Sequence, residues 1–223
     1  MQSLHTGRFL PRQVCEATDG TVWTLGYDLD LCDSPDDADR NVVRHYSFEK
    51  GLLERLVVLD SISKSSDAIL NASSPGKSFL RCGKDRVSVF FGFAAQYIEV
   101  DASNGKLARW NIALPPIAGG KANGFAVTEE GRIFVSLYGV SEADNTVTYG
   151  LYELKAKAGT SVATLIPVNG TITTHDRNGI PPAPEESFDR LLGADRDELV
   201  VHRHGDGWGI SWAKVSASPS SSD

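Results

Sequence analysis

The chain has 223 residues, a formal net charge of −7 and a hydrophobic fraction of 41%. Its 22 Lys and Arg residues form no dense cluster and are outnumbered by 29 Asp and Glu, which argues against a nucleic-acid partner because phosphate binding needs gathered cations. The apolar runs are much shorter than a membrane span, so we expect no membrane insertion. The acidic field favours cationic ligands instead.

Four segments in chain order have the pattern of a strand, a tight turn and a second strand. Apolar residues, alternating or continuous, flank turns that contain Asp-Gly, Glu-Gly or other small polar residues. Gly suits these turns because it adopts a positive φ without strain. The four predicted hairpins span residues 12–27, 78–92, 124–139 and 189–205.

A second kind of hairpin follows each of the first three. Gly51, Gly105 and Gly159 mark its turns, and their spacing is constant (105 − 51 = 54 and 159 − 105 = 54). These hairpins cover residues 46–56, 98–110 and 152–165, and the fourth unit lacks its last strand. An all-strand repeat of roughly 50 residues is typical of propeller blades.

The sequence therefore predicts an all-β protein. Its expected architecture is a β-propeller with about four antiparallel blade units, as either a closed small ring or a fragment of a larger propeller. Residues 1–215 form the predicted single domain, and the Ser/Pro-rich tail at 216–223 is expected to be disordered. The one candidate helix lies near residues 63–72. In a closed ring, residues 6–11 would pair with residues 208–215 and protect an open sheet edge.

Residues 121–136, which include Asn123-Gly124 and the turn Glu130-Gly131, resemble the repeat of six-bladed propellers in the SMP-30/gluconolactonase, NHL and YVTN group. In the gluconolactonases, the Asn of such an Asn-Gly step ligates a divalent metal near the propeller axis. The resemblance thus implies a metal at Asn123. The family's other oxygen ligands are not found at the matching positions, so the alternative that Asn123-Gly124 only turns the chain into a strand stays open.

The histidines supply a second candidate metal site. His202 and His204 alternate along one predicted strand and so face the same way, a spacing that can bring two imidazoles to one metal. His175, in the preceding long connection, could add a third ligand. The alternative is that these histidines lie on a solvated strand face.

Cys15, Cys32 and Cys82 have no metal-type spacing, and we expect all three to be reduced and structural. The first residues lack the apolar segment of a signal peptide, which predicts a cytoplasmic protein. If the chain is an N-terminally truncated fragment, a periplasmic or secreted location stays open.

No catalytic motif is present: the sequence contains neither a Gly-x-Ser-x-Gly elbow nor a phosphate-binding glycine loop. Strand aromatics such as Trp23, Phe134 and Tyr138 are expected to pack between sheets. We therefore predict a non-enzymatic binding or interaction propeller, with an unidentified protein or small-molecule partner, no cofactor-binding residues and no known catalytic residue. The alternative is a metal-dependent, lactonase-like hydrolase with a divalent cation near the axis.

Overall fold

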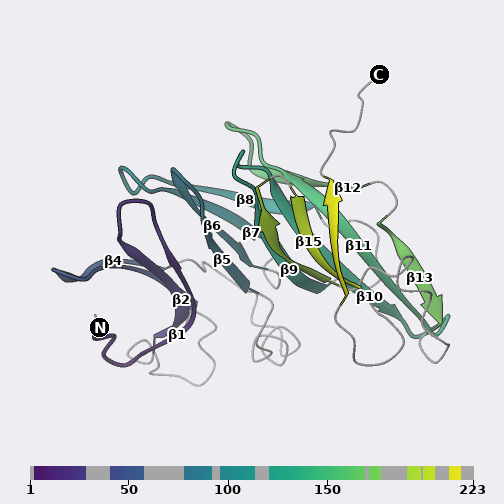
Figure 1. Ribbon diagram of the computed structural model, residues 1–223, viewed down its shortest axis with the longest axis horizontal. Helices are drawn as coiled ribbons and strands as arrows, with labels where there is room; N and C mark the ends of the chain where they lie inside the picture. The colour runs from purple at the N-terminus through teal and green to yellow at the C-terminus, as the bar shows by residue number, and fades with distance from the viewer. Residues whose placement is uncertain are drawn as a thin grey trace. The chain divides into compact units, whose positions relative to one another are not determined.

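The computed structural model describes residues 3–28, 41–57, 78–91, 96–113, 121–168, 171–176, 190–196, 198–203 and 211–216. Every regular element in these ranges is a β-strand, so the predicted all-β class is confirmed (Figure 1). The chain divides into two compact units, Met1–Arg109 (unit 1) and Trp110–Asp223 (unit 2). The part of the chain that the structure describes contains no helix long and apolar enough to cross a membrane.

Several sequence-based predictions concern residues that the structure does not describe, or pairings that it does not test. The candidate helix near residues 63–72 lies outside the described residues, as do residues 217–223 of the predicted tail. The prediction of one domain over residues 1–215 depends on how the two units associate, and it stays a prediction. The same holds for the pairing of residues 6–11 with 208–215. Within unit 1, Phe9, Leu10 and Pro11 already belong to the first strand.

Unit 1 contains two antiparallel sheets. The first has the order β1-β2-β3-β4 and consists of β1 (Phe9–Glu16), β2 (Val22–Asp28), β3 (Asn41–Ser47) and β4 (Gly51–Val57). The second begins with β5 (Ser78–Cys82), β6 (Arg86–Phe91), β7 (Gln96–Asp101) and β8 (Leu107–Ala113), of which β8 continues into unit 2. Each strand follows its neighbour along the chain, as hairpins predict.

The predicted glycine turns have the expected backbone. Gly51, Gly105 and Gly159 have φ values of 73°, 70° and 81°. Gly51 is the first residue of β4, and the other two lie between the two strands of a hairpin. These values fall in the left-handed region, which a residue with a Cβ adopts only at a cost. The hairpin predicted around each of these glycines is therefore confirmed.

The two sheets of unit 1 pack their apolar faces against each other. Trp23 is 1% exposed, and its ring stacks on that of His45 with centroids 4.0 Å apart. The buried cluster around it draws on β2, β3, β5, β6 and β7: Ala17, Trp23, Leu25, Val43, Leu80, Val87, Val89, Phe91, Ile98 and Val100. Burial of this apolar area is the main driving force for the association of the two sheets.

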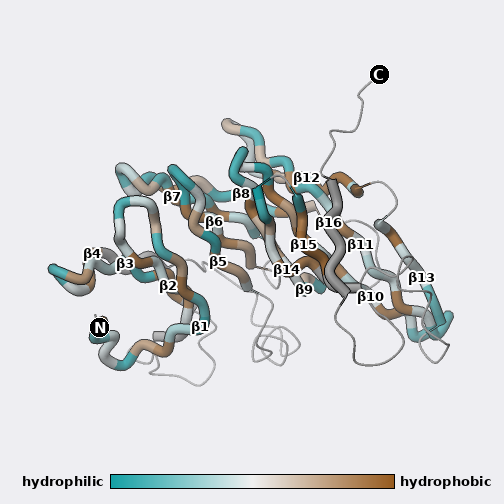
Figure 2. The backbone as a smooth tube through the Cα atoms, in the orientation of Figure 1, coloured by the Kyte–Doolittle hydropathy of each residue, from teal (hydrophilic) through white to brown (hydrophobic). Residues whose placement is uncertain are grey.

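The sheet that begins with β5 continues into unit 2 through β8 and has nine strands in all, in the order β5-β6-β7-β8-β12-β11-β10-β9 with β13 paired to β11. The described residues therefore form three sheets, and four separate blades are not confirmed. The unit 2 strands of this larger sheet are β9 (Lys121–Val127), β10 (Ile133–Ser141), β11 (Thr146–Lys155), β12 (Val162–Pro167) and β13 (Thr173–Asp176). The smaller has the order β14-β15-β16 and consists of β14 (Arg190–Asp195), β15 (Glu198–Arg203) and β16 (Ser211–Ser216). The C-terminal part of β8 pairs in parallel with β12. Figure 2 shows hydrophobic stretches in the inner strands, and those of unit 2 form a cluster of Ala126, Phe134, Leu151, Leu191, Leu199 and Val201.

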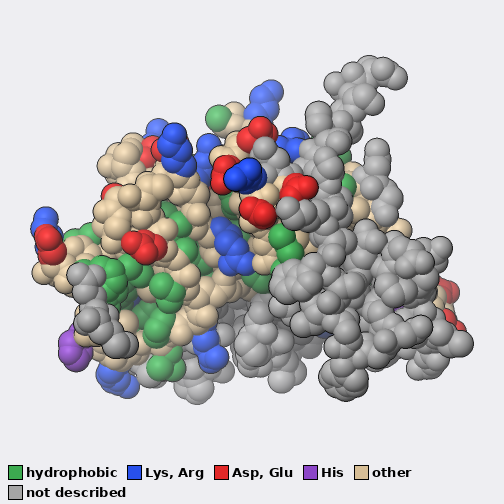
Figure 3. Space-filling model, in the orientation of Figure 1, with side chains coloured by type: hydrophobic (Ala, Val, Ile, Leu, Met, Phe, Trp, Pro, Cys, Tyr) green, Lys and Arg blue, Asp and Glu red, His purple; other side chains and the backbone are tan. Residues whose placement is uncertain are grey.

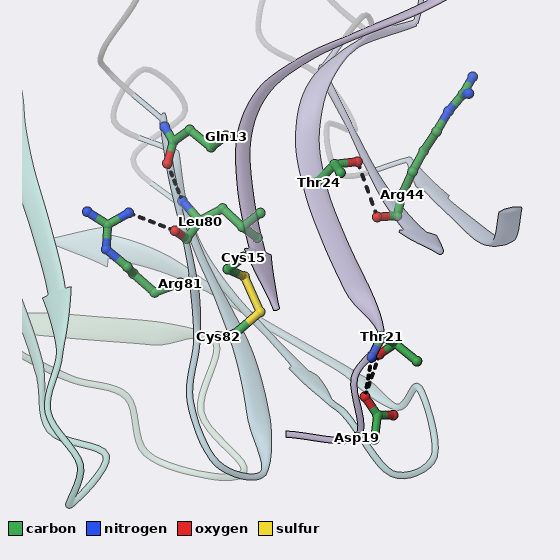
Figure 4. The surroundings of a disulfide bond; sticks show 9 residues. All are labelled: Gln13, Cys15, Asp19, Thr21, Thr24, Arg44, Leu80, Arg81 and Cys82. Carbon is green, nitrogen blue, oxygen red and sulfur yellow. Dashed lines mark hydrogen bonds between the residues drawn. A yellow bond between two sulfur atoms is a disulfide. The ribbon is translucent and has the colours of Figure 1, made fainter. Parts of the chain in front are cut away.

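Cys15 of β1 and Cys82 of β5 form a disulfide, with Cα atoms 5.6 Å apart (Figure 4). The prediction that all three cysteines are reduced is therefore wrong for these two, and Cys32 lies outside the described residues. The 67-residue separation carries no signal of pairing in the sequence. The two thiols meet because their strands lie side by side at the edge of the core of unit 1.

Side-chain hydrogen bonds accompany this disulfide along β1 and β5. The Gln13 amide donates to Ser78 O and accepts from Leu80 N, the latter at 2.8 Å (Figure 4). Just beyond the C-terminal ends of the two strands, the Thr18 hydroxyl donates to Lys84 O at 2.9 Å. In these contacts, higher residue numbers in and after β1 meet higher residue numbers in and after β5. The two strands therefore run parallel, and side chains join them. We refer to this contact as the β1–β5 seam.

Unit 2 has a similar contact between β9 and β14. A Cβ on Gly124 would lie 2.1 Å from Leu191 O, so the two backbones approach closely, and Glu129 N donates to Arg196 O at 3.4 Å. Here too the residue numbers rise together. In each unit, therefore, an edge strand of one sheet lies parallel to an edge strand of another, β1 beside β5 in unit 1 and β9 beside β14 in unit 2.

The two leading hairpins also share their turn hydrogen bonds. Ala17 N donates to Thr21 O and Gly20 N to Ala17 O in unit 1. In unit 2 the corresponding bonds run from Thr128 N to Arg132 O and from Gly131 N to Thr128 O, an offset of 111 residues in each case (128 − 17 and 131 − 20). The β1–β2 and β9–β10 hairpins thus have the same local design.

Candidate functional site

Asn123 lies in β9, at the close approach to β14. Its Oδ1 accepts a hydrogen bond from the Ser136 hydroxyl at 2.6 Å, and the Ser136 Oγ accepts one from Leu191 N at 3.0 Å. Ser136 is fully buried, so this relay satisfies a buried backbone donor of β14. The Asn123 carbonyl thus has a role in holding two sheets of unit 2 together. A metal at Asn123 stays a prediction.

His175 lies in β13, which pairs antiparallel with β11. Its ring stacks on that of Tyr149, with centroids 5.6 Å apart and planes 18° apart. Tyr149 in turn stacks on Tyr138 of β10 at 6.1 Å. Tyr138, Tyr149 and His175 therefore form a ladder of three rings across three neighbouring strands, and all three residues are half-buried.

This ladder lies on a three-stranded extension of unit 2, which we call the tip sheet: residues 138–141 of β10, 146–149 of β11 and 173–176 of β13. Residues directly opposite each other share a face. The register places Val147 beside His175 and Tyr149 beside Thr173, so one face carries the rings together with Thr173. The opposite face carries the Thr148 hydroxyl, which lies 2.9 Å from the Thr174 hydroxyl.

Two buried polar atoms on the ring face are unsatisfied. His175 Nδ1 and Thr173 Oγ1 are shielded from solvent, and neither has a hydrogen-bond partner among the described residues. Buried polar atoms nearly always have a hydrogen-bond partner, because a buried polar atom without a hydrogen bond costs about 1–3 kcal/mol of stability. Both atoms can accept a hydrogen bond. The ring face therefore has two acceptors without a described partner, and both are covered in this structure.

The end of the tip sheet is acidic. Glu142 and Asp144 lie in the β10–β11 turn, and Asp176 ends β13; all three are exposed. Asn145 donates to Asp176 at 3.0 Å, which joins the turn to β13. Figure 3 shows Asp and Glu side chains at the right-hand edge, over the end of β13. Exposed carboxylates attract a cation at short range.

The structure does not show whether the other two candidate metal ligands, His202 and His204, lie near His175. His202 lies in β15, opposite Arg190 and Trp212 in the register, but its side chain is outside the described part of the structure, as is all of His204. Among the described residues, no group of three or more His, Cys, Asp or Glu could hold a metal ion. The three-histidine metal site therefore stays a prediction.

Sequence reasoning identified His175 but not its companions. Tyr138 was expected to pack between sheets, and it is half-buried on the tip sheet instead. The spacing of Thr173 and His175 is a usable signal, because alternate residues of a strand share a face. The partner strand could not be inferred, since β13 pairs with residues 24–30 positions earlier (173 − 149 = 24 to 176 − 146 = 30) across an intervening strand.

No protein-family model matches the chain, and no curated protein sequence matches it.

Proposed function

We propose that the chain is a non-enzymatic binding module, built as a β-propeller, that uses the tip sheet to bind a Lys- or Arg-bearing peptide segment. The observation that carries the binding proposal is the combination of half-buried stacked rings and exposed carboxylates on one small sheet. Lys and Arg side chains have only donors, so they complement these carboxylates.

Two further effects favour a cationic partner. A cation over a tyrosine ring gains about 0.5–1 kcal/mol at an exposed site. Glu142, Asp144 and Asp176 add attraction at short range, and the net charge of −7 would steer a basic segment toward the protein. The propeller part of the proposal is supported within each unit by the parallel edge strands of neighbouring sheets, an arrangement that consecutive blades share.

The binding proposal is tested with a short synthetic peptide of Lys and Arg in a Gly/Ser background, against an acidic peptide of equal length. Calorimetric titration of the wild-type chain should detect binding of the basic peptide alone, with an affinity that falls as salt rises. Tyr138→Ala and Asp176→Asn should each weaken binding by about two- to fivefold. Glu49→Gln, in the exposed β3–β4 turn, is the matched control.

Absence of binding, or equal losses in the Glu49 control, would remove the tip sheet as the binding surface. The architecture is tested separately by small-angle scattering. One closed, compact body of this length should have a radius of gyration of about 17 Å. A clearly larger radius, from two units that do not pack together, would contradict the propeller.

A further inference from the structure

The β1–β5 seam gives unit 1 a covalent link between its two sheets. Cys15 and Cys82 are both partly buried, and both pack against the apolar cluster that the two sheets share. Hydrogen bonds from Gln13 on one side and Thr18 on the other fix the register of the two strands. The folded chain therefore holds the two sulfur atoms at bonding distance through contacts that do not depend on the disulfide itself.

Formation of this bond requires an oxidant. The two thiols lose two protons and two electrons as the sulfur–sulfur bond forms, and a disulfide-carrying exchange partner accepts them and leaves as two thiols. Such partners keep structural disulfides oxidised outside the cytosol, whereas cytosolic thiols are held reduced. A half-buried pair next to a hydrophobic core has the position of a structural bond, since reductants reach it poorly.

We infer that the chain folds and works in an oxidising compartment, where the Cys15–Cys82 disulfide clamps the two sheets of unit 1 together. This inference replaces the cytoplasmic location predicted from the N-terminal residues. The bond closes a loop of 67 residues, and a cross-link over so long a loop removes many conformations from the unfolded chain. The inference rests on unit 1 alone, so it stands or falls independently of peptide binding by the tip sheet.

The first test counts free thiols. The chain has three cysteines, so the clamped protein has at most one free thiol (3 − 2 = 1), and the fully reduced protein has three. Rapid alkylation of intact cells that make the protein, followed by mass analysis of peptides, should find Cys15 and Cys82 protected from the alkylating reagent. Both residues fully alkylated in the native cells would overturn the inference.

The second test measures how much the Cys15–Cys82 disulfide raises the melting temperature. Reduction of the folded protein should lower its melting temperature by about 10 °C, since a loop of this length gives one of the larger disulfide contributions. Cys15→Ala with Cys82→Ala should melt like the reduced protein and no longer respond to reductant, whereas Cys32→Ala should respond like wild type. A melting temperature unchanged by reductant would show that the clamp has no structural role. Should the double variant fail to fold, the reductant titration of the wild type still decides.

Discussion

At the scale of single residues, two strands of unit 2 approach closely because one residue has no side chain. Gly124 illustrates this: its missing Cβ leaves room for the backbone of Leu191, and Ser136 Oγ would lie 2.7 Å from the added atom. The glycine is needed here for proximity and not for an unusual φ. The Asn-Gly step of β9 thus has a packing explanation within unit 2.

Gly124→Ala should therefore be costly. Because the nearest atom is the backbone carbonyl oxygen of Leu191, which cannot rotate away, we expect a loss of about 2–3 kcal/mol in the free energy of unfolding, measured by urea denaturation. Gly193→Ala is the control, since no atom lies within 4 Å of a Cβ built there. It should change stability by no more than about 0.5 kcal/mol. Equal effects of the two substitutions would contradict the close approach.

Glu153 contributes a pH dependence. Burial alone would raise the pKa of this carboxyl, but hydrogen bonds from Arg132 and Lys155 outweigh it and hold the pKa below its usual value of 4.5. Arg132 binds both carboxylate oxygens, at 2.9 and 3.0 Å. The folded state thus binds protons less readily than the unfolded state, so this stabilisation is present above about pH 4.5 and is lost as the pH falls through the lower folded pKa.

Glu153→Gln should consequently reduce the loss of thermal stability between neutral pH and pH 3, measured by circular dichroism melts at each pH. The exposed Glu49→Gln should leave the pH dependence as in the wild type. A wild-type pH profile in the Glu153 variant would show that the Arg132 contact does not favour the ionised carboxylate.

At the scale of elements, the outer edge of β11 is completed by two strands in succession. β12 pairs with Tyr152–Lys155 and β13 with Thr146–Tyr149, which leaves Gly150 and Leu151 between them. Thr171 fills this gap: its hydroxyl accepts from Leu151 N at 3.3 Å and lies 2.7 Å from Val168 O, to which it donates. The side chain replaces a partner strand where the ladder is interrupted.

Thr171→Val keeps the shape of the side chain and removes its hydrogen bonds. Since the residue is buried, we expect a loss of about 1–2 kcal/mol in unfolding free energy and faster hydrogen exchange at Leu151 N. Thr174→Val, on the exposed face of β13, is the control and should leave exchange at Leu151 unchanged. Unaltered protection of Leu151 in the Thr171 variant would contradict this role.

The elements differed in how well the sequence predicted them. Hairpins marked by a glycine turn were predictable, because alternation and the turn lie within a dozen residues of each other. β13 and the disulfide were not, because each depends on a partner strand far along the chain. The same limit applies to the tip sheet: the sequence shows His175, but only the register of β10, β11 and β13 brings it to the tyrosine rings.

At the scale of the whole molecule, the N-terminal residues are integrated into unit 1. Phe9 is 1% exposed, and the guanidinium carbon of Arg44 lies 4.5 Å from its ring centroid. Arg44 also donates to Thr6 O at 3.1 Å. Thr6, before β1, and Phe9, its first residue, thus both contact the buried guanidinium of Arg44.

Deletion of residues 1–10 should therefore lower the melting temperature by about 10 °C, through loss of Phe9 and the Thr6 carbonyl. Deletion of residues 1–5 alone should have little effect. Phe9→Ala separates two explanations: a comparable loss would place the effect within unit 1, whereas a much larger loss in the ten-residue deletion would support a ring-closing strand. No change in any variant would contradict both.

The matched hairpins of the two units offer a template for protein engineering. Cys15 corresponds to Ala126 (126 − 15 = 111), and Cys82, opposite Val87, corresponds to Ala194, opposite Leu199 on the core side of its strand. An artificial staple from Ala126→Cys and Ala194→Cys would reproduce in unit 2 the cross-link that unit 1 already has. The native chain has a disulfide between the sheets of unit 1, whereas unit 2 has no cysteine. Unit 2 is therefore the part of the chain where a new disulfide has the most room to raise thermal stability.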